Sequence, residues 1–132
     1  MLDRRNPEIY GVRSFDMYLA DLRKEFPGEE LEYFQSNCEG AIIDAIQDYA
    51  CREECEAIII NPGAYTHYSY AIADALADVR IPVFEVHLSN IMKREEFRRR
   101  SVTAQHARGM ICGFGLESYR LALQHIIQCR PL

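Results

Sequence analysis

The spacing of apolar side chains predicts four helices. After Ser14, aromatic and leucine side chains recur every three or four residues, which predicts an amphipathic helix that ends at Pro27. Asn37 can cap a second helix, which carries isoleucines at the same spacing. Alanine-rich residues 69–79 predict a third helix, and residues 116–127 predict a fourth.

Short apolar runs between these helices predict strands. Residues 56–61 (EAIIIN) and 83–87 (VFEVH) are typical of parallel strands that are buried on both faces. Residues 31–36 (LEYFQS) are aromatic-rich and predict another strand, and residues 109–115 (GMICGFG) predict a last strand with a glycine turn. The alternation predicts an α/β fold, a doubly wound parallel sheet in three α/β/α layers.

The start of the chain is unusual for this architecture. A doubly wound domain normally opens with a central strand, whereas here a polar segment leads directly into a helix. We expect residues 1–132 to form a single domain, and we expect the first strand of its sheet to be encoded upstream of Met1.

Composition and charge narrow the possible functions. Hydrophobic residues make up 48% and charged residues 27%, a balance that indicates a globular protein with neither a membrane span nor a secretory signal. The net charge of -5 disfavours a nucleic-acid or acidic-membrane surface, although cations gather in residues 93–100 (KREEFRRR), which suit a small anion. The five cysteines show no paired spacing, so we expect reduced thiols and a cytoplasmic protein.

Polar side chains follow two of the predicted strands. Asn61 and His67 come after the first, and His87, Ser89 and Asn90 come at the end of the second. In sheets of this class, ligands bind beyond the carboxyl ends of the strands. A single histidine is most often a structural hydrogen-bond partner, but two histidines with amides and a hydroxyl at adjacent strand ends favour a small-molecule site.

Other kinds of chemistry lack their sequence patterns. A metal site at His67 and His87 would need Asp74 or Glu85 as a third ligand, at no recognised spacing. A metal-dependent hydrolase is therefore a minor alternative. Ser89 has no nucleophile elbow, and the glycine turn lacks the third glycine of a dinucleotide loop.

The polar segment RRNPEIYG brings Tyr10 close to two arginines. A loop tyrosine usually makes a hydrophobic contact. However, a guanidinium from Arg4 or Arg5 can lower the pKa of the phenol from about 10 and make a phenolate available as a base.

Five stretches taken together resemble the type II 3-dehydroquinate dehydratases: RRNPEIYG, EYFQSNCEG, IIINPGAYTHYS, PVFEVHLSN and REEFR. The most specific part is NPGAYTH followed by EVHLSN. The resemblance implies a flavodoxin-like fold and anti elimination of water from 3-dehydroquinate through an enolate, a shikimate-pathway step of aromatic amino acid biosynthesis that needs no cofactor. It also implies trimers that assemble into a homododecamer.

The resemblance assigns roles to individual residues. Tyr10 matches the base that takes the C2 proton, Arg5 matches the arginine that favours its phenolate, and His87 matches the acid that protonates the departing hydroxyl. The substrate-binding positions are matched by Asn61, His67, Asp74, Leu88, Ser89 and Arg98. In the family, the aspartate at the position of Asp74 belongs to the site of a neighbouring subunit.

The sequence also departs from the family pattern. The family's first strand and its GPNLN-like segment are absent, Tyr68 replaces a smaller threonine, and Met92 stands where histidine is common. These departures define an alternative, an N-terminally truncated and catalytically impaired module that binds a small anion. Dehydratase chemistry through a lysine Schiff base is not favoured, because it needs a desolvated lysine, whereas Lys24 lies on the polar flank of the first helix and Lys93 in the charged run.

Overall fold

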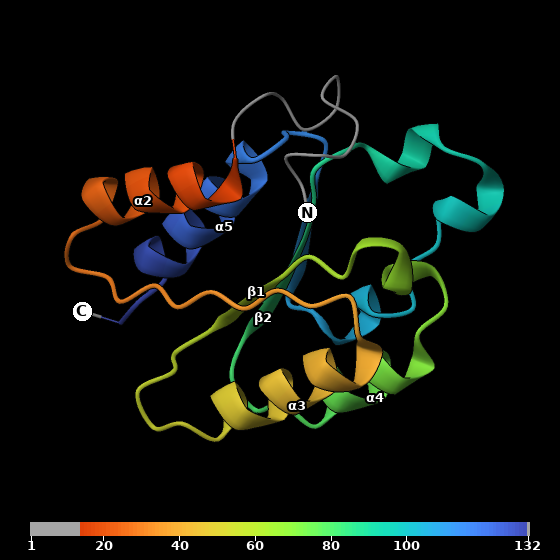
Figure 1. Ribbon diagram of the computed structural model, residues 1–132, viewed down its shortest axis with the longest axis horizontal. Helices are drawn as coiled ribbons and strands as arrows, with labels where there is room; N and C mark the ends of the chain where they lie inside the picture. Colours follow the sequence, from red (N-terminus) through yellow and green to blue (C-terminus); the bar gives the residue numbers. More distant parts are fainter. Residues whose placement is uncertain (1–13, 132) are drawn as a thin grey trace.

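The computed structural model describes residues 14–131, where helices pack on both faces of a parallel sheet (Figure 1). The helices are α2 (Phe15–Glu25), α3 (Glu39–Ala50), α4 (Tyr70–Ala77) and α5 (Glu117–Gln128), and the strands are β1 (Ile58–Ile60), β2 (Val83–His87) and β3 (Gly109–Cys112). β2 lies between β1 and β3 and runs parallel to both. The predicted α/β class is confirmed. None of the helices in this range has the length and apolar character that crossing a membrane requires.

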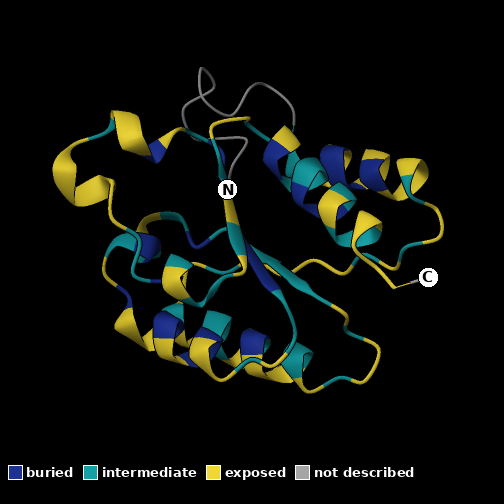
Figure 2. Cartoon of the chain, turned by 180° about the vertical axis from the view of Figure 1, so that it is seen from behind, coloured by how far each residue is buried: buried dark blue, intermediate teal, exposed yellow. Residues whose placement is uncertain are grey.

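Each face of the sheet has its own hydrophobic core, because successive side chains of a strand point to opposite faces. α3 and α4 pack on Val83 of β2 on one face, and α5 packs on Phe84 and Val86 on the other. Figure 1 shows α3 and α4 below the sheet, with α2 and α5 above it. Each of these helices carries buried residues, which Figure 2 colours dark blue. Glu85 and His87 alternate with Phe84 and Val86, so they share the face of Val83.

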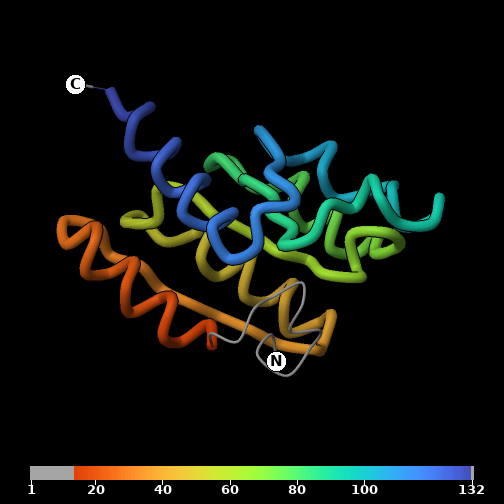
Figure 3. The backbone as a smooth tube through the Cα atoms, turned by 90° about the horizontal axis from the view of Figure 1, so that it is seen from above, coloured from red at the N-terminus to blue at the C-terminus, as the bar shows by residue number. Residues whose placement is uncertain are grey.

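Residues 31–36 are not a strand, so this prediction was wrong. They lead back from the end of α2 toward the start of α3 (Figure 3), and they pair with no strand of the described part. Tyr33 and Phe34, the aromatic residues that suggested a strand, are 41% and 47% exposed. Tyr33 stacks on Phe15 of α2, with ring centroids 4.5 Å apart. Aromatic composition favours a strand, but a ladder also needs a neighbour to satisfy its backbone groups.

The helix ends follow the sequence signals with one exception. Ser14 and Ser69 cap α2 and α4 with their side-chain oxygens. Asn37 does not cap α3, contrary to the prediction, because the N-cap position is occupied by Cys38. The backbone N–H of Cys38 instead donates to Oγ of Ser36 at 3.0 Å. The hydroxyl of Ser36 therefore satisfies one of the backbone N–H groups at the start of α3, as a capping side chain would.

Candidate active site at the carboxyl ends of β1 and β2

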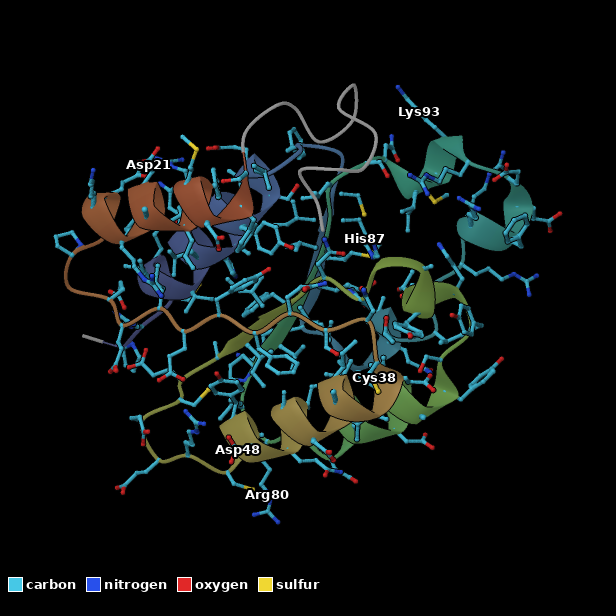
Figure 4. The ribbon with its side chains drawn as sticks, in the orientation of Figure 1. Asp21, Cys38, Asp48, Arg80, His87 and Lys93 are labelled. Carbon is cyan, nitrogen blue, oxygen red and sulfur yellow. The ribbon has the colours of Figure 1, made fainter. Side chains whose placement is uncertain are left out.

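β1 and β2 end side by side, so the segments that follow them meet at one edge of the sheet. Ile60 of β1 pairs with Glu85 of β2, and His87 pairs with Cys112 of β3. Asn61 therefore lies at the same edge as His87. Figure 4 shows His87 at this end of β2 and Arg80 at the opposite end of the molecule. The predicted adjacency of the two strand ends is confirmed.

A buried carboxylate holds the imidazole of His87. Nε2 of His87 lies 2.7 Å from Oε2 of Glu85, and their side chains are 5% and 0% exposed. The Glu85 carboxylate also accepts hydrogen bonds from the hydroxyls of Thr66 at 3.0 Å, Ser101 at 2.8 Å and Thr103. Four donors from three segments of the chain thus converge on one buried side chain.

These donors keep Glu85 ionised. Burial raises the pKa of the Glu85 carboxyl, but the hydrogen bonds from His87, Thr103 and Ser101 together outweigh burial and lower the pKa below its ordinary value. An ionised carboxylate only accepts hydrogen bonds, so Nε2 of His87 carries the shared proton. Nδ1 is then the ring nitrogen through which His87 can exchange a proton with a ligand.

The amide of Asn61 is fixed from two sides. Its Oδ1 accepts a hydrogen bond from the N–H of Gly63 at 3.1 Å, and its Nδ2 donates to the hydroxyl of Tyr119 in α5 at 3.0 Å. The Tyr119 ring meets Phe15 edge-on, with centroids 5.0 Å apart. Tyr119 was not predictable as a partner of Asn61, because it follows 58 residues later on a different element.

His67 is tied to Arg100, the last of the basic residues 93–100. Its Nδ1 lies 2.7 Å from the carbonyl oxygen of Arg100, which can only accept, so Nδ1 carries the proton and Nε2 is left for a ligand. The N–H of Val102 donates to the carbonyl of Thr66 at 2.7 Å. The loops after β1 and β2 are therefore joined.

The remaining predicted site residues lie in different settings. Leu88 is buried and Ser89 half-buried, directly after His87. Arg98 is exposed at the end of a single 3-10 turn (Glu96–Arg98), with its Nε 3.5 Å from Glu95. Asp74 lies on the exposed side of α4. Tyr10 and Arg5 lie outside the described residues.

Two other features bear on the chemistry. Among residues 14–131, no group of three or more His, Cys, Asp or Glu side chains is arranged as a metal site. A groove of about 440 Å³ runs along α3, but it contains none of the predicted site residues; it is lined by Phe34, Ala41, Asp44, Ala45, Asp48, Tyr49 and Arg52. The candidate site is therefore placed at the buried, hydrogen-bonded side chains around Glu85 and His87 and not at this groove.

Comparison with known proteins gives concordant results. Residues 1–127 match the family described as Dehydroquinase class II. The 3-dehydroquinate dehydratase of Lachnoclostridium phytofermentans is 54% identical over 125 residues, which cover 93% of this chain and 86% of the relative. That of Clostridium beijerinckii is 50% identical over 126 residues, which cover 94% and 86%.

Solved structures agree with the sequence relatives. The type II dehydroquinase from Butyrivibrio crossotus superposes with a TM-score of 0.88 at 45% identity, covering 96% of this chain and 88% of that one. The type II dehydroquinase from Propionibacterium acnes gives a TM-score of 0.88 at 40% identity, with the same coverage of 96% and 88%.

Proposed function

The chain belongs to the class II dehydroquinase family, and from this premise we propose that it is a hydro-lyase that converts 3-dehydroquinate to 3-dehydroshikimate. The observation that carries the proposal is the match over residues 1–127, which spans the strand ends where His87 and Asn61 lie. The alternative of a binding module without turnover is not favoured. The reaction is a step of the shikimate pathway.

Elimination of water beside a ketone needs a base, an acid and a partner for the charge that develops on oxygen. The C–H next to a ketone is weakly acidic, so a strong base must take the proton from C2. Tyr10, as a phenolate favoured by Arg5, is proposed for this step. His87 is proposed as the acid that protonates the departing hydroxyl, so that one proton is taken, one is given, and water leaves.

The environment of His87 supports the acid role. An imidazolium beside an ionised Glu85 has a proton on Nδ1 to give, while Nε2–H remains bound to the carboxylate. The Glu85 carboxylate accepts the Nε2–H and thereby fixes which ring nitrogen is left for the substrate. Because Glu85 is itself held by three hydroxyls, the ring is oriented before substrate arrives.

Substrate binding is proposed for the residues around this centre. Arg98 presents a planar fork that suits a carboxylate, and the backbone N–H groups of Leu88 and Ser89 complete that contact. Asn61 and His67 are proposed to bind the hydroxyl and carbonyl groups of the ring. Asp74 is proposed to reach the site of a neighbouring subunit, and its exposed position on α4 supports this contact. The subunits are proposed to form trimers that build a dodecamer in the cytoplasm.

The proposed reaction is tested by incubating the purified protein with 3-dehydroquinate and following the ultraviolet absorbance of the enone product. The absorbance is expected to rise, and to rise equally after treatment with a chelator. Binding of 3-dehydroquinate by calorimetry without any rise in absorbance would favour the binding module and overturn the proposed function.

The Arg98→Ala variant is expected to raise KM about tenfold or more and to change kcat less. The substrate carboxylate takes no part in the bonds that form or break, so its contact is held nearly equally in the ground state and the transition state, and loss of that contact mainly affects binding. One charge-assisted contact is worth roughly 1.5–3 kcal/mol. Arg80→Ala removes an exposed arginine at the opposite end of the molecule and is the matched control (Figure 4). An unchanged KM would remove Arg98 from the site.

The Tyr119→Phe variant is expected to lower kcat/KM about fivefold, because Nδ2 of Asn61 loses the hydroxyl that fixes it and the net worth of such a bond is about 1 kcal/mol. The aromatic contact with Phe15 is retained. Tyr70→Phe, at a position that is 69% exposed, is the control for the loss of a phenol hydroxyl. Equal kinetics for the two variants would show that Asn61 needs no support from α5.

A further inference from the structure

We propose that the glycine turn after β3, residues 113–115, aims the backbone N–H groups of Leu88 and Ser89 at the substrate carboxylate. The identity of that anion rests on the proposed function. The geometry of the turn is independent of the proposed function. The turn and Ser118 are thus positioning residues, which act through the backbone that follows His87.

The turn holds two successive peptide groups. The N–H of Gly113 donates to the carbonyl of His87 at 3.0 Å, and the N–H of Gly115 donates to the carbonyl of Leu88 at 2.9 Å. A peptide group is planar and trans, so its C=O and its N–H point in opposite directions. A fixed His87 carbonyl therefore fixes the N–H of Leu88, and a fixed Leu88 carbonyl fixes the N–H of Ser89.

The backbone conformation of the turn requires glycine. Gly113 has φ +94 and Gly115 has φ +59, in the left-handed region that side chains disfavour. A Cβ on Gly113 would lie 3.3 Å from Cβ of Asn90, the residue that follows Ser89. At Gly115 a Cβ would meet nothing within 4 Å. Of these two glycines, only Gly113 would bring an added Cβ against the segment that follows His87.

A third hydrogen bond connects this arrangement to α5. Oγ of Ser118, a side chain that is 0% exposed, donates to the His87 carbonyl at 3.4 Å. The side chain of Asn90 accepts from the N–H of Met92 at 3.1 Å and holds the other end of the segment. The two donors are therefore supported from both sides before a ligand binds, which is what preorganised recognition of an anion requires.

The Gly113→Ala variant tests the inference through steady-state kinetics with 3-dehydroquinate. KM is expected to rise about tenfold with a smaller change in kcat, because misaligned carboxylate donors weaken ground-state and transition-state binding alike. Ile46→Val, in the core under α3, loses stability without touching the turn and is expected to keep the KM of the unaltered protein. An unchanged KM in Gly113→Ala overturns the inference.

A second substitution distinguishes an effect of crowding at Asn90 from a general disturbance of the structure. Asn90→Gly removes the Cβ that Gly113→Ala would crowd, whereas the left-handed φ of Gly113 still disfavours alanine, so in the Asn90→Gly background the Gly113→Ala substitution is expected to raise KM by a smaller factor than in the unaltered protein. A rise in KM from Gly113→Ala that is equally large in both backgrounds overturns the inference. If Gly113→Ala does not fold, Ser118→Ala serves instead, with an expected KM rise of about twofold to threefold for the loss of one long hydrogen bond; no rise overturns the inference.

Crystal structures of the unaltered protein and of Gly113→Ala test the same inference without turnover. The peptide group between His87 and Leu88, whose carbonyl accepts from Gly113, is expected to rotate in the variant, and superimposable peptide groups would overturn the inference. Absence of turnover in the unaltered protein would overturn the proposed function alone, because the crystallographic comparison uses no substrate.

Discussion

Replacing His87 with asparagine is expected to lower kcat by about 10²- to 10⁴-fold, the usual loss when a general acid is removed. The asparagine amide can still donate a hydrogen bond toward Glu85, but it has no proton to transfer to the departing hydroxyl. KM is expected to change less, because protonation of the leaving group occurs only in the transition state. The absorbance assay at saturating 3-dehydroquinate measures the effect.

His125→Asn is the matched control for the His87 variant. His125 lies near the end of α5, is exposed, and contacts Phe84 through its ring with centroids 5.5 Å apart. This variant is expected to retain turnover close to that of the unaltered protein. If His87→Asn kept more than about a tenth of the activity, the acid would have to be another group.

The sequence predicted the parts of the fold that are set by local pattern and burial. β2 was correctly predicted from five consecutive residues, all of which are buried in the structure. The predicted β1 began two residues too early and ended one residue too late, which is the usual size of error at strand ends. The failure at residues 31–36 has a different cause. Tyr33 and Phe34 have strand-like side chains, but a strand depends on partners that no local pattern encodes.

The site was predictable only where its residues lie close in sequence to a strand end. Asn61 and His87 follow apolar runs, so their placement at one edge of the sheet was expected. Glu85 was considered only as a metal ligand, although a spacing of two residues in a strand places it on the same face as His87. Tyr119 and Gly113 gave no comparable signal, because their contacts with the site depend on how α5 and β3 pack.

Replacing Glu85 with glutamine is expected to lower the free energy of unfolding by about 3 kcal/mol, since it removes a buried carboxylate that accepts several hydrogen bonds and leaves donors without an acceptor. The glutamine side chain fits the space but keeps one acceptor oxygen. Its amide nitrogen would face groups that now donate to Glu85, among them His87 and Thr66. Urea denaturation at one fixed protein concentration measures the loss, and Glu53→Gln, at an exposed position after α3, is the control.

The loss caused by Glu85→Gln is also expected to depend on pH. The pKa of Glu85 in the folded protein lies below the value of about 4.3 for an unfolded glutamate, so between these values the unfolded chain binds more protons. The stability contributed by the carboxylate is therefore fully present above the unfolded pKa and is lost as the pH falls through the folded pKa. The gap in unfolding free energy between the unaltered protein and the variant should shrink from pH 6 toward pH 3. A gap that stays constant over this range would mean that Glu85 does not hold His87 as an ionised carboxylate, and the proposed orientation of the acid would lose its physical basis.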